Sequence, residues 1–233
     1  MTMSVTVETA AVEVSSKPSR KKSSKGEETR TKINGATLQI IKRDGMRGVR
    51  HRAVAKEAGV SLGATTYHFK NIEDLIVSAF VQWRTVGSKR GNPITNRVLG
   101  FIDKNATTLL KSESGRITLA REIYLFMVDY ELDQIERHRG DRVVELAFYH
   151  ESLLLEELRR EVLNYWEAQL EVLIVSLAAL HSPNPVADAR ITLSIFHQLE
   201  REAVMKGDDD DRTLLKATLH RHVCHLIGVE FTP

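Results

Sequence analysis

The fold of this chain is constrained most by residues 52–69, which read RAVAKEAGVSLGATTYHF. They predict a helix, a sharp turn and a second helix. Ala55 is small enough for a close helix crossing, and Gly59 allows the positive φ that the turn requires. Val60 fills the angle between the two helices, and Ser61 is a favourable N-cap for the second. An angled pair of this kind is a helix-turn-helix.

The charge of the chain is divided unevenly along its length. Residues 1–70 contain 14 Lys and Arg against 6 Asp and Glu, a net charge of +8, and the remaining residues carry a net charge of −6. A basic region in front of an acidic remainder favours a polyanionic partner for the first region. Because the second helix of a helix-turn-helix can enter the major groove, the two features together indicate double-stranded DNA as that partner.

Helical periodicity continues on both sides of the motif. A helix is expected in front of it, from Thr29 to Gly45, and another behind it, from the N-cap Asn71 to a breaker at Gly87–Pro93. Further helices are expected at residues 94–111, 115–136, 186–206 and 212–229, with Asp208–Asp211 as the last connector. Between residues 136 and 186, a long helical stretch is expected from the break at His138–Asp141 to Leu180, with an interruption near His150–Leu153. The predicted fold class is all-α, a three-helix helix-turn-helix DNA-binding module followed by a larger helical bundle.

The first 26 residues are expected to form a disordered basic tail. Their Ser, Lys and Pro content cannot bury enough apolar area to offset the entropy of ordering. Their basic side chains could lie along phosphates or in a minor groove, or make no specific contact: Lys17, Arg20, Lys21, Lys22 and Lys25. The predicted domains are therefore this tail (1–26), a DNA-binding domain (27–87) and a second helical domain (88–233).

Several classes of protein are disfavoured by what the sequence lacks. The longest apolar run, Val172–Leu180, has nine residues, whereas a membrane span needs about 20, so no membrane partner is expected. The N-terminus lacks the order of a signal peptide, and the single cysteine, Cys224, suits a reducing cytoplasm. No phosphate-binding glycine loop or nucleophile elbow is present. We therefore expect neither an enzyme nor a cofactor.

Residues 29–45, TRTKINGATLQIIKRDG, and residues 49–76, VRHRAVAKEAGVSLGATTYHFKNIEDLI, resemble the tetracycline-repressor (TetR) family of bacterial transcription regulators. The most characteristic part is YHFKNIEDL at 67–75, at its distance from Gly59. The resemblance implies a homodimer that binds a palindromic operator in the bacterial cytoplasm, associated with the nucleoid. It also implies a C-terminal domain that holds the pocket for an unknown small-molecule effector and the dimer interface, formed by the last two helices.

The chemistry of the motif assigns roles to its side chains. Arg52 and Lys70 are expected to hold phosphates, and Tyr67 and His68 are further phosphate donors or pack against the first helix. Early in the recognition helix, methyl groups suit thymine methyls and hydroxyls can bond base edges. The complete predicted DNA-binding set is Arg52, Ser61, Leu62, Ala64, Thr65, Thr66, Tyr67, His68 and Lys70.

Aromatic and flexible side chains are concentrated in the middle of the second domain. They are expected to form the wall of an apolar pocket with tyrosine hydroxyls and an imidazole as polar anchors, or else ordinary core. The candidates are Tyr124, Met127, Tyr130, Phe148, His150, Tyr165 and Trp166. The neighbouring carboxylates Asp129, Glu131 and Asp133 are expected on a solvated face.

The cluster of histidines and one cysteine in the last helix does not have the arrangement of a metal site, because its members point to different sides of a helix and no second thiol or carboxylate completes a set. These residues are assigned instead to the dimer face and its rim: His220, His222, Cys224 and His225. No metal is expected.

The function predicted from the sequence is a ligand-responsive DNA-binding regulator, usually a repressor in this family, in which an effector shifts the fourth helix. Two alternatives remain. One is an architectural or protein-interaction module that uses DNA as a scaffold without a small molecule. The other is a helical enzyme with an incidental basic region.

Overall fold

The computed structural model describes residues 25–207 and 212–233, with the backbone only for residues 90–95. Within these ranges the chain forms helices and no strand, which confirms the all-α prediction. The elements are α1 (Lys25–Asp44), the 3-10 turn η1 (Met46–Gly48), α2 (His51–Ala58), α3 (Leu62–His68), α4 (Ile72–Leu109), α5 (Glu113–Glu136), α6 (Arg139–Glu151), α7 (Glu156–Ala179), α8 (Pro185–Lys206) and α9 (Arg212–Ile227). The predicted connector Asp208–Asp211 and most of the predicted basic arm (Lys17, Arg20, Lys21, Lys22) lie outside the described residues.

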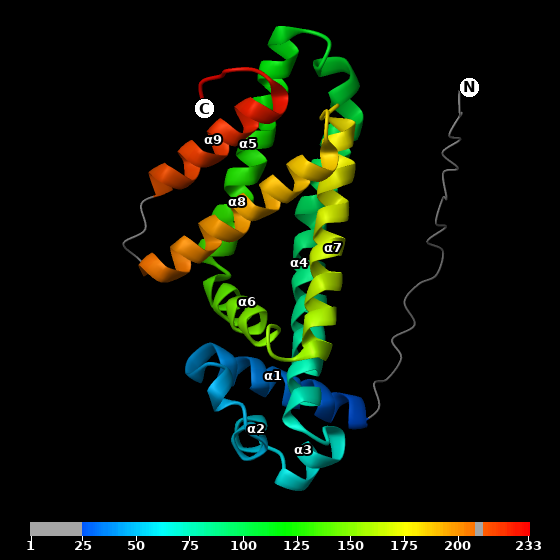
Figure 1. Ribbon diagram of the computed structural model, residues 1–233, viewed down its shortest axis with the longest axis vertical. Coiled ribbons are helices and arrows are strands. Elements are labelled where there is room, and N and C mark those ends of the chain that lie inside the picture. The colour runs from blue at the N-terminus through cyan, green and yellow to red at the C-terminus, as the bar shows by residue number, and fades with distance from the viewer. Residues whose placement is uncertain (1–24, 208–211) are drawn as a thin grey trace, which may run out of the picture.

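Helices α1, α2 and α3 lie together at one end of the molecule, with α6 beside α1 (Figure 1). The apolar face of α1 is fully buried there, as the helical period of Ile33, Ile40 and Ile41 predicted. The core they form also contains Phe80 of α4 and Phe148 of α6, whose rings meet edge to face with centroids 5.2 Å apart. The end of the molecule that carries the helix-turn-helix is therefore packed directly against α6.

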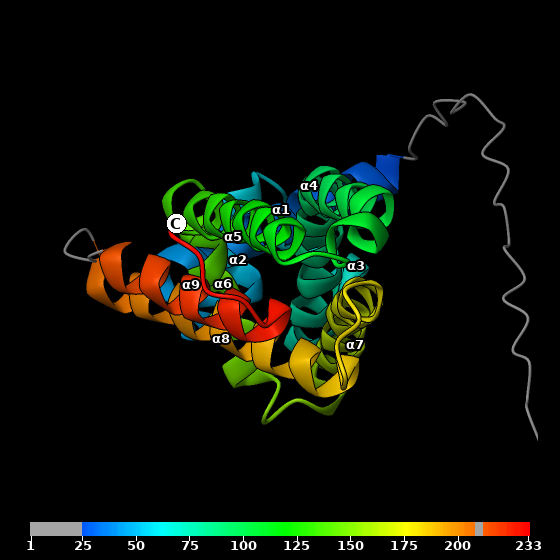
Figure 2. The same ribbon diagram turned by 90° about the horizontal axis from the view of Figure 1, so that it is seen from above.

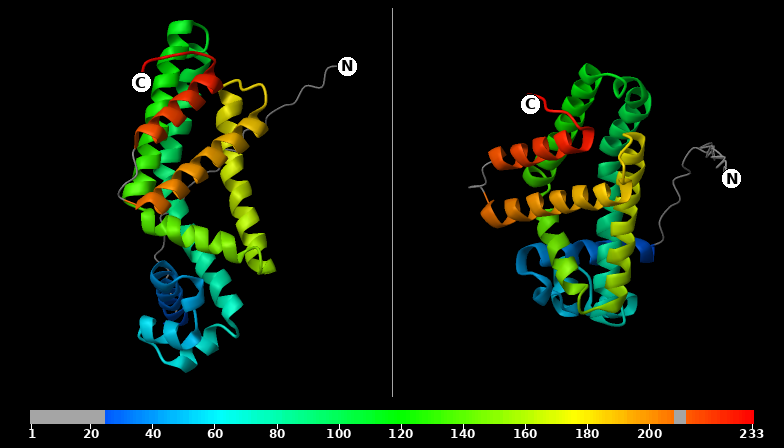
Figure 3. Two further views of the ribbon diagram at one scale, coloured as in Figure 1. Left: turned by 60° about the vertical axis from the view of Figure 1, so that its left-hand side comes forward. Right: turned by 45° about the horizontal axis from the view of Figure 1, so that its top comes forward.

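A second core lies at the opposite end, between the second half of α4 and helices α5, α8 and α9. Seen from above, α8 and α9 lie along one side of the molecule and α4 and α7 along another (Figure 2). Helix α7 packs against both α4 and α8, and α5 packs against α9. The left view of Figure 3 shows α6 between the two ends of the molecule.

The breaker predicted at Gly87–Pro93 is wrong. Helix α4 continues through these residues from Ile72 to Leu109, so the predicted domain boundary at residues 87 and 88 falls inside one helix. A proline inside a helix removes one backbone hydrogen bond, but α4 packs against α1, α5 and α7 along its length. Tertiary packing of this kind outweighs the local preference to end the helix.

The other predicted boundaries differ from the structure by a few residues at most. Helix α1 begins at Lys25, inside the segment assigned to the tail. The interruption expected near His150–Leu153 is confirmed by the turn between α6 and α7. Within residues 25–207 and 212–233, no helix combines the length and apolar composition that crossing a bilayer requires.

Candidate DNA-binding surface and inner charged cluster

The turn between α2 and α3 has the backbone that its sequence predicts. Gly59 adopts a left-handed conformation with φ 63°, where a residue with a side chain would be strained. The Ser61 hydroxyl accepts a hydrogen bond from the Ala64 N–H at 3.1 Å and so caps α3. Asn71 caps α4 in the same way, accepting from the Asp74 N–H at 2.7 Å. These contacts hold α3 at a defined angle on the surface.

One face of α3 is open to solvent. Tyr67 is 84% exposed and Leu62 44% exposed, and Thr66 is exposed as well. Arg52 of α2 and Lys70, two residues after α3, are exposed too. Large apolar side chains at the surface indicate a binding site when they are grouped. The structure thus brings these five predicted side chains to the surface of one short segment.

Thr65 does not belong to that surface. It is fully buried, and its hydroxyl donates to the Leu62 carbonyl at 2.7 Å. The prediction that Thr65 contacts a base edge is wrong, because its side chain faces the same core as Phe69, four residues later. Ala64 and His68 are half-buried, and the His68 ring meets the Tyr67 ring edge to face at 5.2 Å.

Gly63 belongs to the exposed face, although sequence reasoning did not select it. It is exposed within a helix, where glycine costs about 1 kcal/mol relative to alanine. A Cβ built on Gly63 would have only the Ser61 hydroxyl within 4 Å, at 3.9 Å. Packing within the chain therefore does not require glycine here. The space around Gly63 leaves room for another molecule to approach the backbone.

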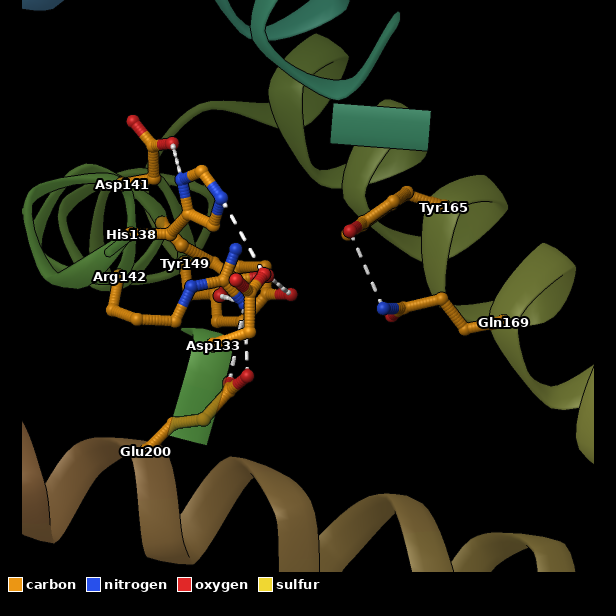
Figure 4. A network of polar contacts seen from close by, with 9 residues as sticks. Asp133, His138, Asp141, Arg142, Tyr149, Tyr165, Gln169 and Glu200 are labelled. Carbon is orange, nitrogen blue, oxygen red and sulfur yellow. Dashed lines mark hydrogen bonds and ion pairs between the residues drawn. The ribbon is translucent and has the colours of Figure 1, made fainter. Parts of the chain in front are cut away.

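A buried group of charged side chains lies between α5, α6 and α8. We call it the charged cluster: Glu131, Arg142, Glu145 and Glu200. The Arg142 Nη1 donates to Glu145 Oε2 at 2.8 Å and to Glu200 Oε1 at 3.1 Å. The Tyr149 hydroxyl donates to Glu145 Oε1 at 2.7 Å. Figure 4 shows Arg142 directed toward Glu200 on α8, with Tyr165 and Gln169 on α7 across from them.

Glu131 is the exception in this cluster because it has no hydrogen-bond partner. Its side chain is fully buried, and neither carboxylate oxygen has a partner within the described residues. Burial, with the negative charge of Glu200 adding to it, raises the pKa of Glu131 well above its usual range. The prediction that Glu131 lies on a solvated face is wrong, whereas Asp129 on the same helix is exposed, as expected.

The pKa values of Glu200 in the cluster and of His197 beside it are also shifted. Burial raises the pKa of Glu200 to about 7, against the opposing effect of Arg142. Burial lowers the pKa of His197, one turn earlier on α8. Arg142, Glu145, Tyr149, His197 and Glu200 surround a narrow recess of about 10 Å³, which is room for about one water molecule. Perturbed titratable groups of this kind occur both at functional sites and in buried ion-pair networks.

The predicted pocket residues divide into two groups. Tyr130 and Tyr165 act electrostatically on members of the charged cluster, and the Trp166 ring meets the Tyr149 ring at 5.2 Å. The remaining four do not form the wall of one cavity with them. Phe148 is core, His150 is exposed, Met127 packs in the second core and Tyr124 contacts His220 and Phe231. The alternative of ordinary core is the better description of Phe148, and the charged cluster differs from the expected apolar wall because it carries charged side chains.

Helix α6 connects the charged cluster to the DNA-binding end. The Arg142 guanidinium lies over the Trp83 ring of α4, 5.9 Å from its centroid. Two residues further along α6, Val144 is buried in the core that contains Ile33 and Ile40 of α1. A change in the position of Arg142 would therefore act on both α4 and α1.

The outer faces of α8 and α9 form a partly apolar groove. Ile191 is 47% exposed and Leu214 59% exposed. The groove itself is lined by Ile195, Leu214, Ala217, Thr218, Arg221, His222 and His225. His222 is mostly buried, since its Nε2 lies 2.8 Å from the Thr192 hydroxyl of α8, and burial lowers its pKa to about 4. Cys224 is buried too, so only part of the predicted dimer face is open.

Residues 33–79 match the family model described as bacterial regulatory proteins, tetR family. Among solved structures, the chain is similar to a transcriptional regulator from Rhodococcus sp. Rha1, with a TM-score of 0.62 and 18% identity over 88% of this chain and 99% of that chain. It is similar to the multidrug binding protein EbrR complexed with imidazole (TM-score 0.50, 25% identity, 84% and 89% of the two chains). A regulator from Saccharomonospora viridis in complex with choline has a TM-score of 0.56 and 18% identity, over 86% and 96%. Among curated proteins, none matches this chain.

These similarities confirm the resemblance expected from the sequence. Residues 33–79, which contain α2 and α3, match the helix-turn-helix family of tetR-type regulatory proteins, and the described fold is similar to that of a transcriptional regulator.

Proposed function

We propose, from the premise that residues 33–79 are a tetR-type DNA-binding domain, that this chain is a ligand-responsive repressor. It binds a palindromic operator as a homodimer in the bacterial cytoplasm, and a small molecule at the charged cluster releases it. The observation that supports ligand response is Glu131, a buried carboxyl group with no hydrogen-bond partner within the described residues. A buried polar group without a partner destabilises a fold, and a ligand that bonds it removes this cost.

The exposed face of α3 supports direct contact with DNA. Its recognition residues are Leu62, Gly63, Thr66 and Tyr67, with Ala64 beside them. Arg52 and Lys70, both exposed and positively charged, are proposed to hold phosphates. Ser61 and His68 support this surface through the helix cap and the contact with Tyr67. Thr65 is buried and is not proposed to contact DNA.

The dimer is proposed to form through α8 and α9, by their exposed apolar side chains. Two copies would then place their α3 helices in successive major grooves, about 34–36 Å apart. In this proposal an effector moves Arg142, and α6 and α4 transmit the change to the helix-turn-helix. A coupling free energy of about 1–3 kcal/mol between the two sites is typical of such switches.

Selection from randomised double-stranded DNA with the purified full-length protein tests this function. We expect enrichment of an inverted repeat whose half-sites are one helical turn apart. Recovery of unrelated sequences, or of a single half-site without symmetry, would contradict binding as a homodimer. Release of the selected DNA by a small molecule then separates the effector proposal from the scaffold alternative.

Replacing Lys70 by alanine should weaken binding similarly on all DNA sequences. Loss of one phosphate contact lowers the slope of log affinity against log salt concentration by about 0.9. Titration of a labelled operator at several salt concentrations measures both quantities. Lys104→Ala, an exposed lysine in the second half of α4, should leave the slope unchanged. An unchanged slope for Lys70→Ala would remove that residue from the phosphate contacts.

Replacing Gly63 by alanine should have opposite effects on folding and on DNA binding. The fold gains up to about 1 kcal/mol because alanine favours the helix and meets open space. Operator affinity should fall about tenfold or more, since the added methyl blocks close approach of the backbone. Gly35→Ala in α1 also meets open space and should stabilise the fold without changing the affinity. Equal DNA affinities of the two variants would contradict the role of Gly63.

A further inference from the structure

The charged cluster contains more acidic groups than its one arginine can balance. Its three carboxyl groups are each at most 4% exposed, and Arg142 is 9% exposed. Arg142 Nη1 bonds both Glu145 and Glu200, and Tyr149 adds a further bond to Glu145. If all three carboxyl groups were ionised, three negative charges would face one positive charge in the interior of the protein.

The other titratable groups that face the cluster do not supply the missing positive charge. Burial lowers the pKa of His197 on α8, which favours its neutral imidazole. Arg201, which lines the same recess as His197, is exposed to solvent. Burial raises the pKa values of three tyrosines around the cluster, so their hydroxyls stay protonated and neutral: Tyr130 on α5, Tyr149 on α6 and Tyr165 on α7.

Protons are the remaining source of positive charge. Glu131 has no hydrogen-bond partner for either carboxyl oxygen within the described residues, and ionising such a buried group is unfavourable. Burial and the charge of Glu200 raise the pKa of Glu131, and burial raises the pKa of Glu200 to about 7. Protons on both groups would leave the ion pair of Arg142 with Glu145, in which the charges balance.

Ionisation of these two carboxyl groups acts on α6. Glu131 lies on α5 and Glu200 on α8, and α6 packs against both helices. When both groups lose their protons, they repel each other and compete for Arg142 of α6. Arg142 lies over the Trp83 ring of α4, and α6 also packs against α1. Both α1 and α4 adjoin the helix-turn-helix, so the protonation of the cluster can influence how firmly α2 and α3 are held.

We infer that the charged cluster is a proton-binding site, in which Glu131 and Glu200 hold protons in the folded chain and whose loss of protons loosens α6 and weakens operator binding. Operator affinity should therefore fall as the pH rises through neutrality, because a helix-turn-helix that is held less firmly loses more freedom on binding DNA. This pH response needs no small molecule. Only its effect on operator affinity rests on the proposed function.

Infrared spectroscopy of the native full-length protein tests the proton site without a variant. A protonated carboxyl group has a C=O stretching band that is separate from the carboxylate bands. At about pH 7.5 exposed carboxyl groups are ionised, since their ordinary pKa values are about 4. We expect a protonated-carboxyl band at this pH that decreases toward about pH 9 as Glu200 ionises. A native spectrum without this band would overturn the proton site.

Two carboxyl groups of α5 provide matched variants for counting protons. Each proton that the folded chain binds in excess of the unfolded chain lowers the folding equilibrium constant about tenfold per pH unit. In urea unfolding between about pH 5.5 and pH 7, Glu131→Gln should remove about one proton from this slope and weaken the infrared band. Asp129→Asn, which alters an exposed carboxylate, should change neither. Equal slopes for Glu131→Gln and the native protein would contradict a proton on Glu131.

A double variant tests the link to DNA. Glu131→Gln, Glu200→Gln leaves only the balanced pair of Arg142 and Glu145, so its operator affinity should vary less with pH than that of the native protein. At about pH 8 it should bind the operator about fivefold more tightly than the native protein, a gain that damage to the fold does not produce. Histidines of the DNA-binding end, such as His68, titrate in both proteins and cancel in this comparison.

The outcomes separate this inference from the proposed function. Equal or weaker binding by the double variant at about pH 8 would overturn the link to DNA. If that variant does not fold, as measured by circular dichroism, a native operator affinity that changes less than about twofold between about pH 6 and pH 8 would overturn it instead. If no DNA sequence is selected, the proposed function fails, whereas the infrared and unfolding measurements still decide whether the cluster holds protons.

Discussion

Arg142→Met is expected to lower the free energy of unfolding by about 3–5 kcal/mol at pH 8. Arg142 is 9% exposed and is the shared partner of Glu145 and Glu200. Methionine fills much of the same space but leaves the buried carboxylates of Glu145 and Glu200 without their counter-ion. Removing one partner of a buried ion pair is far more destabilising than removing a surface pair, because the remaining charge stays desolvated.

The destabilisation should decrease as the pH is lowered. A carboxyl group whose pKa is raised in the folded state binds its proton more tightly there than in the unfolded chain. It therefore lowers stability as the pH rises from the unfolded value, near 4.5, through the folded value, about 7 for Glu200. Without Arg142 the folded pKa values of Glu200 and Glu131 rise further. At pH 5 these groups are protonated in the variant, and its deficit should be smaller than at pH 8.

Urea unfolding at pH 5 and pH 8 measures this difference. Arg137→Met is the matched control, because Arg137 makes an exposed ion pair with Asp133, which contributes about 0–1 kcal/mol. The triple variant Arg142→Met, Glu145→Gln, Glu200→Gln should be more stable at pH 8 than the single variant, since it removes the unbalanced charges. A deficit independent of pH, or one no larger than that of Arg137→Met, would show that the cluster does not behave as a set of buried charges.

The sequence predicted the helix-turn-helix better than the inner cluster, for a physical reason. The helix-turn-helix depends on local requirements that single residues reveal, such as the positive φ of Gly59 and the caps Ser61 and Asn71. Thr65 was assigned to the DNA-binding face because its hydroxyl can bond a base edge. Its position in the helical repeat, which places the side chain in the core, was not taken into account. Phe69, four residues later, is buried, and residues four apart on a helix share a face, so Thr65 lies on the same buried side.

Glu131 was misassigned in a similar way. It lies three residues after Val128 and four before Ile135, both buried, so the helical period places it on the inner face of α5. The prediction placed Glu131 on a solvated face because its side chain is charged, although its position in the helical repeat is that of a buried residue. Its neighbours Arg142 and Glu200 come from other helices, and no local pattern reveals that they meet. The continuous α4 was missed for a related reason, because its support comes from α5 and α7 rather than from residues 87–93 themselves.

The double variant Ile191→Glu, Leu214→Glu is expected to convert the protein to a monomer and to lower operator affinity about a hundredfold or more. Both side chains are about half exposed, on α8 and α9, so the substitutions should leave the fold of each chain intact. Two like charges on each copy oppose each other across a two-fold interface. In a dimer, binding of one half-site holds the second recognition helix close to the other half-site. Without the dimer this effective concentration is lost, which lowers the affinity by a factor of about 10²–10⁴.

Light scattering after size-exclusion chromatography measures the oligomeric state, and titration of labelled DNA measures the affinity. Leu154→Glu is the matched control, because Leu154 is 77% exposed in the turn between α6 and α7, away from α8 and α9. It should remain dimeric and keep the native affinity. A double variant that stays dimeric would place the interface elsewhere on the molecule.

The length of the DNA separates loss of the dimer from damage to α3. On an oligonucleotide with one half-site, the double variant and the native protein should bind equally per chain, because only one recognition helix makes contact in either case. On the full operator only the native dimer gains from joining two contacts. A variant that is weak on both DNAs would instead indicate that α8 and α9 control the position of the helix-turn-helix within one chain, through α6 and the charged cluster.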